Sequence, residues 1–193
     1  MQKPKFPDAD EILKMFDALY TQSRDGIKHV SKSVPEVCDE YLRKYHDPEQ
    51  AYKKFCKAQI TKCTTSGFIT GLGGLITLPV TIPANLSSVF YVQMRMIAGA
   101  AYMAGYDLYD DELRTFVYAC LTGVSVNSIL KQFGNEFGKK FTVQMIKKIP
   151  GETLHAINRK IGFRFITKFG QKGMINLGDM VPIVGGFVNG GLY

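Results

Sequence analysis

The stretch CTTSGFITGLGGLITLPVTIPANLSSVFYVQM, residues 63–94, decides how this chain folds, because no charged residue interrupts it. It begins with four glycines, continues through Pro79 and Pro83, and ends in a run of Leu, Val and Phe residues. Glycine and proline disfavour the interior of a helix, so the first part indicates a close-packed helix end and a rigid turn. The second part indicates a helix that is apolar on nearly every side. Such a helix is expected at the centre of a helical core or in contact with lipid.

Helical periodicity continues on both sides of this stretch. Asp47-Pro48-Glu49-Gln50 carries the signals of a helix start, because Asp can cap a helix, Pro suits its first position and Gln completes a capping box. The prediction is therefore an apolar hairpin of two helices, at about 48–78 and 83–105. A further helix at about 110–133 is uncharged over most of its length and is expected to pack on this hairpin.

Shorter helices account for the rest of the chain. One is predicted to start near Asp8 or Asp10, and another to begin at Pro35 and end before His46. No alternating strand pattern of useful length occurs. The predicted fold class is therefore all-α, a compact multi-helix bundle in a single domain that comprises residues 1–193.

Arg95 is the one charge within the predicted central helix. A guanidinium among apolar side chains has to reach solvent or find a carboxylate. Four carboxylates follow shortly after the helix end. We therefore predict a buried ion pair between Arg95 and one of the acids Asp107, Asp110, Asp111 and Glu112.

Glycines are unusually frequent, at 19 of 193 residues, whereas about 7% is average. Glycine lowers helix stability, so glycines among apolar helical residues need a packing or backbone reason. Spacing of four residues lets two backbones approach closely. Close helix contacts or tight turns are expected at Gly67, Gly71, Gly73, Gly74, Gly186 and Gly190.

The net charge of +7 is concentrated in one window of the chain. Residues 139–172 contain nine basic residues and one acid, Glu152, so this window carries +8 and the remaining chain −1. A contiguous positive excess is typical of a face that meets phosphate groups, such as an anionic membrane surface. The predicted contact residues are Lys139, Lys140, Lys147, Lys148, Arg159, Lys160, Arg164, Lys168 and Lys172.

Catalytic and cofactor-binding patterns are not found in the sequence. The three histidines are scattered, and the four cysteines include no C-x-x-C pair. A phosphate-binding loop, a nucleophile elbow and a dinucleotide fingerprint all fail on glycine spacing or on the preceding element. We therefore predict a non-enzymatic protein with no cofactor and no metal. The N-terminus has no apolar signal segment, which predicts a cytoplasmic location.

The glycine-proline stretch at 66–107, the acidic helix start that follows it and VPIVGG near the C-terminus resemble the EcsC family. The resemblance covers about 47–191 and is loose over 1–45. It implies a helical, membrane-associated bacterial protein without an established activity. Because the family is named after a gene that accompanies an ABC transporter, it also implies a membrane transport complex as a partner. Relatives continue into a further helix, so a truncated C-terminus after Tyr193 is expected.

Three interpretations of the function remain open. The first is a peripheral protein on the cytoplasmic face of the cell membrane, with its basic face on anionic lipid. The second is an effector whose glycine-rich 63–104 hairpin inserts into the membrane or forms a pore, although its two prolines divide it into pieces shorter than a simple span. The third is a soluble helical module that binds another protein. Nucleic acid is a less favoured partner because no known binding motif occurs.

Overall fold

The computed structural model describes residues 8–64, 76, 84–122 and 150–169. Within these ranges the chain forms helices and no strand, apart from an isolated bridge between Ile27 and Ser31. The predicted all-α class is confirmed. The helices are α1 (Ala9–Asp25), α2 (Val34–Lys44), α3 (Pro48–Thr64), α5 (Ala84–Met103), α6 (Asp111–Leu121) and α9 (Gly151–Phe169).

Side-chain caps fix where the first three helices begin. Asp8 accepts a hydrogen bond of 2.9 Å from the backbone N–H of Glu11, whose carboxylate accepts one of 2.8 Å from Asp8. Ser33 caps α2 in the same reciprocal way. At α3 the Asp47 carboxylate accepts from the backbone N–H of Gln50 at 3.0 Å, so the predicted start of this helix is confirmed. Each cap satisfies an N–H group that the helix itself leaves without a partner.

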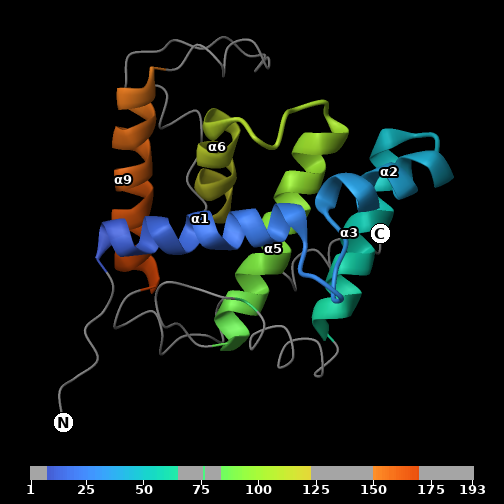
Figure 1. Cartoon of the computed structure of the whole chain (residues 1–193), viewed down its shortest axis with the longest axis horizontal. Coiled ribbons are helices and arrows are strands. Elements are labelled where there is room, and N and C mark those ends of the chain that lie inside the picture. The colour runs from blue at the N-terminus through green and yellow to red at the C-terminus, as the bar shows by residue number, and fades with distance from the viewer. Residues whose placement is uncertain (1–7, 65–75, 77–83, 123–149, 170–193) are drawn as a thin grey trace, which may run out of the picture.

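Helix α5 lies at the centre of the fold and contacts α1, α2, α3 and α6. In Figure 1 the other helices surround it, and α1 crosses in front of it. Its side chains Phe90, Tyr91, Met94 and Ala98 are at most 1% exposed. The predicted central helix is confirmed, and α3 and α6 pack on it as expected. The parts of the predicted helices at 65–75, 77–78, 83 and 123–133 lie outside the described residues, and Ile76, predicted to be helical, is not in a helix.

The turn that ends α5 contains a glycine with a left-handed backbone conformation. Gly105 has a φ of +85°. The backbone N–H of Tyr106 donates to the carbonyl of Ala101 at 3.0 Å, which closes the helix end. Glycine adopts this conformation without the steric cost that a Cβ adds, as is common one residue past a helix. The predicted stop at Gly105 is therefore confirmed.

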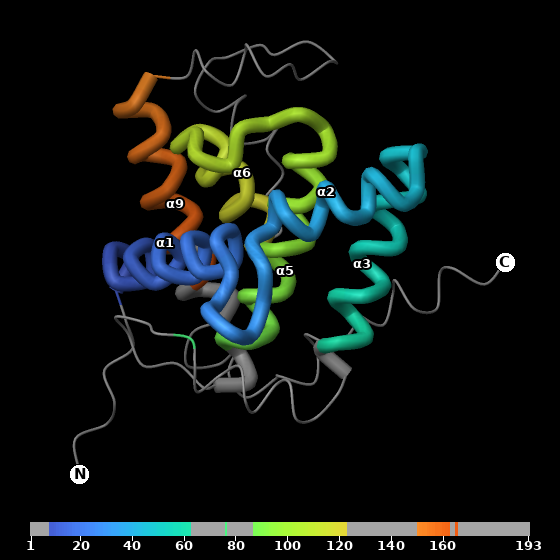
Figure 2. Tube along the Cα trace, turned by 45° about the vertical axis from the view of Figure 1, so that its right-hand side comes forward, coloured from blue at the N-terminus to red at the C-terminus, as the bar shows by residue number. Residues whose placement is uncertain are grey.

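Aromatic side chains join the helices on both sides of α5. Figure 2 shows α1 and α9 on one side of α5 and α3 on the other. On the side of α1, α6 and α9, the ring of Phe16 lies 5.3 Å from that of Tyr118 and 5.0 Å from that of Phe165. On the side of α2 and α3, Tyr41 and Phe55 meet edge to face at 5.9 Å. Such pairs contribute about 0.5–1.5 kcal/mol each beyond the area they bury.

The inward face of α6 differs from the predicted one by about one position. Helical spacing predicts a common face for Leu113, Val117 and Cys120. Leu113 and Val117 are buried, but Cys120 is exposed. Tyr118 turns inward instead, because its ring packs on Phe16 and its hydroxyl donates to the carboxylate of Asp17. Helix α6 lies between α5 and α9, so two partners set its rotation.

Close helix contacts occur at two described glycines, Gly99 and Gly162. A Cβ added at Gly99 would lie 2.5 Å from the ring of Phe55, and one at Gly162 would lie 2.9 Å from the backbone oxygen of Ala9. Helices α3 and α5, and α1 and α9, approach each other at these points. The six glycines predicted from spacing lie outside the described residues.

Gly99→Ala should destabilise the fold, because the added methyl group forces the Phe55 ring out of place. We expect the free energy of unfolding in urea to fall by about 1–3 kcal/mol. Gly151→Ala is the matched control, since nothing lies within 4 Å of a Cβ at that position. If both variants unfold at the same urea concentration as the wild type, the contact at Gly99 is not tight.

Buried acidic groups predict a loss of stability at alkaline pH. Burial raises the pKa of Tyr20 from 10.0 to about 12 and that of the Cys38 thiol from 9.0 to about 12. Each group keeps its proton in the folded state at a pH where the unfolded chain releases it. The stabilisation is therefore complete below about pH 9 and is lost as the pH rises toward about 12.

Thermal melts across this pH range should show a melting temperature that is constant at neutral pH and falls in alkali. Tyr20→Phe also removes a hydrogen bond to the carbonyl of Leu108. The comparison therefore uses the slope of the melting temperature against pH rather than the melting temperature itself. The slope should be shallower for Tyr20→Phe than for the wild type, because the variant has no phenol proton at this buried position. Equal slopes for the two proteins would contradict the prediction.

Candidate interaction surfaces

Helix α9 has one buried and one exposed face. Ile157, Ile161 and Phe165 are at most 3% exposed and pack on the core. Arg159 and Lys160 lie on the exposed face. This division follows from the helical repeat of 3.6 residues, which places positions three and four apart on the same side. The packing of α9 therefore leaves the two cations pointing outward.

The nine basic residues predicted as contacts divide into three groups. Arg159 and Lys160 have described side chains, and both are exposed. Arg164 and Lys168 belong to α9, but their side chains lie outside the described part. The other five lie outside the described residues altogether: Lys139, Lys140, Lys147, Lys148 and Lys172.

Arg95 is buried, as predicted, with 2% of its surface exposed. The prediction that Arg95 pairs with a carboxylate is wrong. One nitrogen of the guanidinium, Nη1, donates to the carbonyl of Ser23 at 2.7 Å, and the other, Nη2, donates to the carbonyl of Lys32 at 2.9 Å. Among the ion pairs of the described residues, none joins Arg95 to Asp107, Asp110, Asp111 or Glu112.

Position explains why the acids after α5 are not partners of Arg95. Its side chain faces the connection between α1 and α2, while the acids lie beyond the C-terminal end of its own helix. Asp107 accepts from the backbone N–H of Tyr109 at 2.9 Å. Asp111, in the first turn of α6, pairs with Arg114 at 2.8 Å. These two acids thus serve the turn and the helix start that follow α5.

Helix α5 holds the loop between α1 and α2, residues 26–33, which we call the α1–α2 hairpin. Arg95 binds the carbonyl of Ser23, in the last turn of α1, and that of Lys32, near the end of the hairpin. Tyr91, one turn before Arg95, shares a hydrogen bond of 2.6 Å with the hydroxyl of Ser31. The backbone N–H of Ile27 donates to the carbonyl of Ser31 at 3.1 Å and closes the hairpin. Hydrogen bonds from a charged donor are stronger than neutral ones, so Arg95 is the main anchor.

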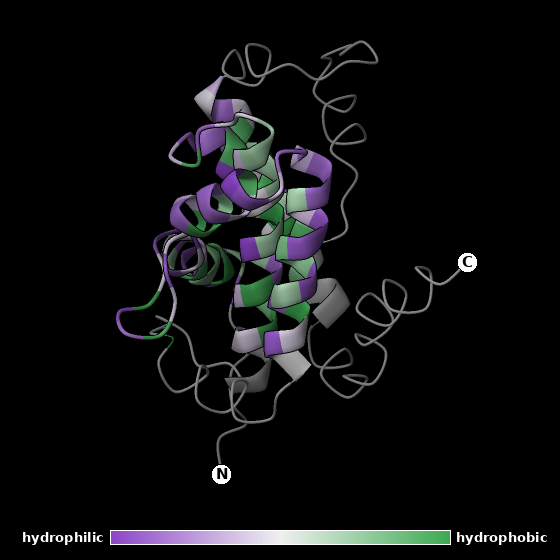
Figure 3. Ribbon diagram, turned by 90° about the vertical axis from the view of Figure 1, so that its right-hand side faces the viewer, coloured by the Kyte–Doolittle hydropathy of each residue, from purple (hydrophilic) through white to green (hydrophobic). Residues whose placement is uncertain are grey.

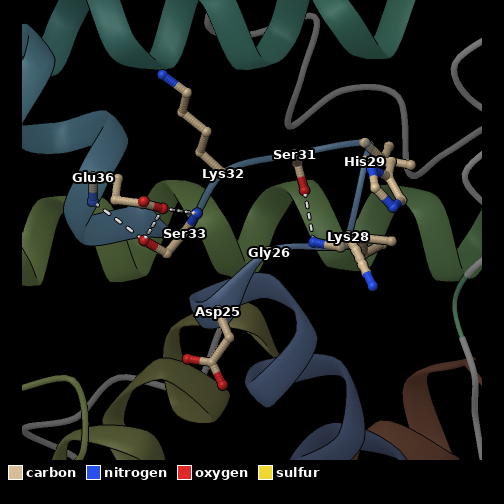
Figure 4. Close-up of a pocket in the computed structure, with 10 residues that line it drawn as sticks. Asp25, Gly26, Lys28, His29, Ser31, Lys32, Ser33 and Glu36 are labelled. Atoms are coloured by element: carbon tan, nitrogen blue, oxygen red, sulfur yellow. Dashed lines mark hydrogen bonds between the residues drawn. The ribbon is translucent and has the colours of Figure 1, made fainter.

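The α1–α2 hairpin borders an open depression of about 590 Å³ that its own residues and Glu36 line. Figure 4 shows that the side chains there diverge: Lys28 and His29 lie at one end, and Lys32 points to the other side. His29 has a φ of +63°, which marks the turn of the hairpin. Because the polar groups do not converge, the depression lacks the geometry of a site for a small molecule.

The hairpin is the feature that the sequence interpretation missed. Ser-Arg-Asp-Gly at 23–26 predicts an interruption of the first helix, and Gly26 adopts a positive φ of +83°. A Cβ there would meet the carbonyl oxygen of Ser31. That close approach, together with the bridge to Ser31, turns the break into an ordered hairpin. The pairing with Tyr91 and Arg95 has no signal in the local sequence.

Three further features bear on function in the described residues: the buried thiols, the possible metal ligands and the apolar character of the helices. Burial raises the pKa of the Cys56 thiol and of the Cys38 thiol, which keeps both in the less nucleophilic neutral form. No cluster of His, Cys, Asp and Glu side chains within the described ranges could hold a metal ion. None of the helices described combines the length and apolar character that crossing a membrane requires.

Arg95→Met should destabilise the fold, because the carbonyls of Ser23 and Lys32 would lose their buried donor. We expect the free energy of unfolding in urea to fall by about 2–4 kcal/mol. Lys53→Met is the control: Lys53 pairs with Glu49 on the surface and is 71% exposed, so its loss should leave the unfolding curve nearly unchanged. Equal effects of the two substitutions would rule out Arg95 as an anchor.

Comparison with known proteins gives one match. A family model described as the EcsC protein family matches residues 10–192. The match begins well before residue 47, so it includes nearly all of α1 and the whole of α2, further than the sequence resemblance indicated. No curated protein and no solved structure matches the chain.

Proposed function

The chain belongs to the EcsC protein family, and we propose that it is a non-enzymatic peripheral protein that binds anionic lipid at the cytoplasmic face of the cell membrane. The observation that carries this proposal is the distribution of charge. Residues 139–172 hold nine cations and one acid, and Arg159 and Lys160 on α9 are both exposed. An accessory role beside a membrane transport complex, such as an ABC transporter, is part of the proposal and is supported by the family resemblance.

The packing of α9 supports a role for these cations other than folding. Its contact with the core is made by Ile157, Ile161 and Phe165, which are apolar. Clustered like charges repel one another and weaken the folded state, so a partner of opposite charge is the simplest reason for the cluster. Anionic headgroups supply such a partner over an extended area.

The attraction between the basic residues and an anionic leaflet can be given an approximate magnitude. Each Lys or Arg close to an anionic leaflet contributes about 1 kcal/mol. If half of the nine cations face the bilayer together, the total is about 4–5 kcal/mol. The attraction fades beyond a Debye length of about 8 Å in physiological salt. The expected association is therefore weak, reversible and sensitive to salt.

The position of α5 favours this interpretation over insertion of the 63–104 hairpin. Phe90, Tyr91 and Met94 are buried among the other helices, and Arg95 anchors the α1–α2 hairpin. If α5 left for the bilayer, it would expose the core that α1, α3 and α6 form with it. A peripheral contact through α9 requires no such loss.

Sedimentation with vesicles tests the proposal. The protein should sediment with anionic vesicles at low salt, much less at high salt, and little with neutral vesicles. Combining Arg159→Glu with Lys160→Glu should weaken binding by about tenfold or more, because attraction becomes repulsion at two exposed positions. The same reversal at Lys53 and Lys54, exposed on α3, is the control for net charge and should have a smaller effect.

Three outcomes would contradict the proposal. Binding to neutral vesicles that ignores salt and both charge reversals would indicate insertion. Binding to no vesicle would leave a soluble module that contacts another protein. Equal losses for the α9 pair and the α3 pair would mean that net charge, rather than α9, drives the association.

A further inference from the structure

The α1–α2 hairpin projects from the helical body. In Figure 3 it extends at the left beyond the end of α1, with hydrophilic and hydrophobic segments next to each other. Its tip consists of the three residues between the bridged positions Ile27 and Ser31, namely Lys28, His29 and Val30. All three are exposed.

Val30 is unusual among the described residues. It and Tyr109 are the large apolar side chains there that are classed as exposed, at 42% and 67%. The ring of Tyr109 is covered on one face by the guanidinium of Arg24, 4.0 Å from the ring centroid. Val30 instead stands at the tip of a protruding hairpin, between a lysine-histidine pair and Ser31.

Side chains of α5 hold the hairpin in place. Arg95 donates to the carbonyl of Ser23, before the hairpin, and to that of Lys32, within it, and Tyr91 shares a hydrogen bond with Ser31. The backbone N–H of Val30 donates to the carbonyl of Ile27 at 2.9 Å, which fixes the tip itself. A preformed loop loses little conformational freedom when it binds, so even a small apolar contact can contribute to affinity.

The acids near the hairpin are occupied by groups outside the tip. Asp25 pairs with Arg24 at 2.7 Å, and Glu36 accepts hydrogen bonds from Ser33. Lys32 pairs with Glu40, and both side chains remain exposed. The tip itself carries Lys28 and no acid. Figure 4 shows Lys28 of the tip and Lys32 of the hairpin pointing in different directions, which suits an extended anionic surface better than a single small anion.

We propose that the tip of the α1–α2 hairpin dips into the interface of an anionic bilayer. Val30 enters the boundary between headgroups and acyl chains, and Lys28 meets the lipid phosphates. This inference rests on the proposed association with anionic lipid and adds an apolar contact to it. An exposed apolar residue flanked by a cation matches the layered polarity of a membrane surface.

The chain contains no tryptophan, so Val30→Trp introduces a single fluorescent probe at the tip. With anionic vesicles, the emission of Val30→Trp should shift to shorter wavelength and should be quenched by lipids brominated near the headgroup. Tyr109→Trp places the same probe at an exposed site outside the hairpin and should show neither effect. Val30→Asp should weaken sedimentation with the same vesicles by about fivefold, since burial of a Val side chain is lost. Val30→Ser is its uncharged counterpart.

The outcomes separate this inference from the proposed function. If Val30→Trp sediments with anionic vesicles but its emission does not change, the hairpin inference is wrong and binding through α9 stands. If neither probe variant sediments, both proposals fail. If Val30→Asp binds as well as the wild type, the tip makes no contact. If Val30→Asp weakens binding and Val30→Ser does not, the added charge acts at a distance and insertion of the tip is excluded.

Discussion

A buried guanidinium without a carboxylate partner is the constraint on which the described structure depends. Arg95 lies in the most apolar of the described helices at 2% exposure, where an unsatisfied charge would be severely destabilising. Its donors bind two backbone carbonyls, from Ser23 at the end of α1 and from Lys32 just before α2. The hydrogen bonds of this one side chain therefore hold the end of α1 and the segment before α2 against α5.

The residues that stabilise the fold differ from those that are exposed to a binding partner. Apolar residues of all the described helices make the core, and the guanidinium of Arg95 binds backbone carbonyls. The exposed cations Arg159 and Lys160, and the tip of the α1–α2 hairpin, take no part in the described core. An anionic lipid surface matches both the charge and the apolar component of these exposed features.

Local signals in the sequence predicted the elements well. The cap at Asp47, the stop at Gly105 and the apolar run of α5 depend on neighbouring residues, and all three are present in the structure. Contacts between residues that are distant in the sequence could not be predicted from local patterns. The partners of Arg95 lie 72 and 63 residues away, whereas the acids that sequence proximity suggested lie close by in the chain. The exposure of Cys120 likewise follows from the rotation of α6 between two helices.

Hydrogen–deuterium exchange of the wild-type protein, with and without anionic vesicles, tests most directly whether the folded body meets the membrane from outside. We predict that vesicles slow exchange in α9 and in residues 26–33, and that exchange in α5 and α3 stays as slow as it is without lipid. Faster exchange in α5 upon addition of vesicles would show that the core opens and would contradict peripheral binding. Unchanged exchange in both α9 and the hairpin would contradict the assigned contact surfaces.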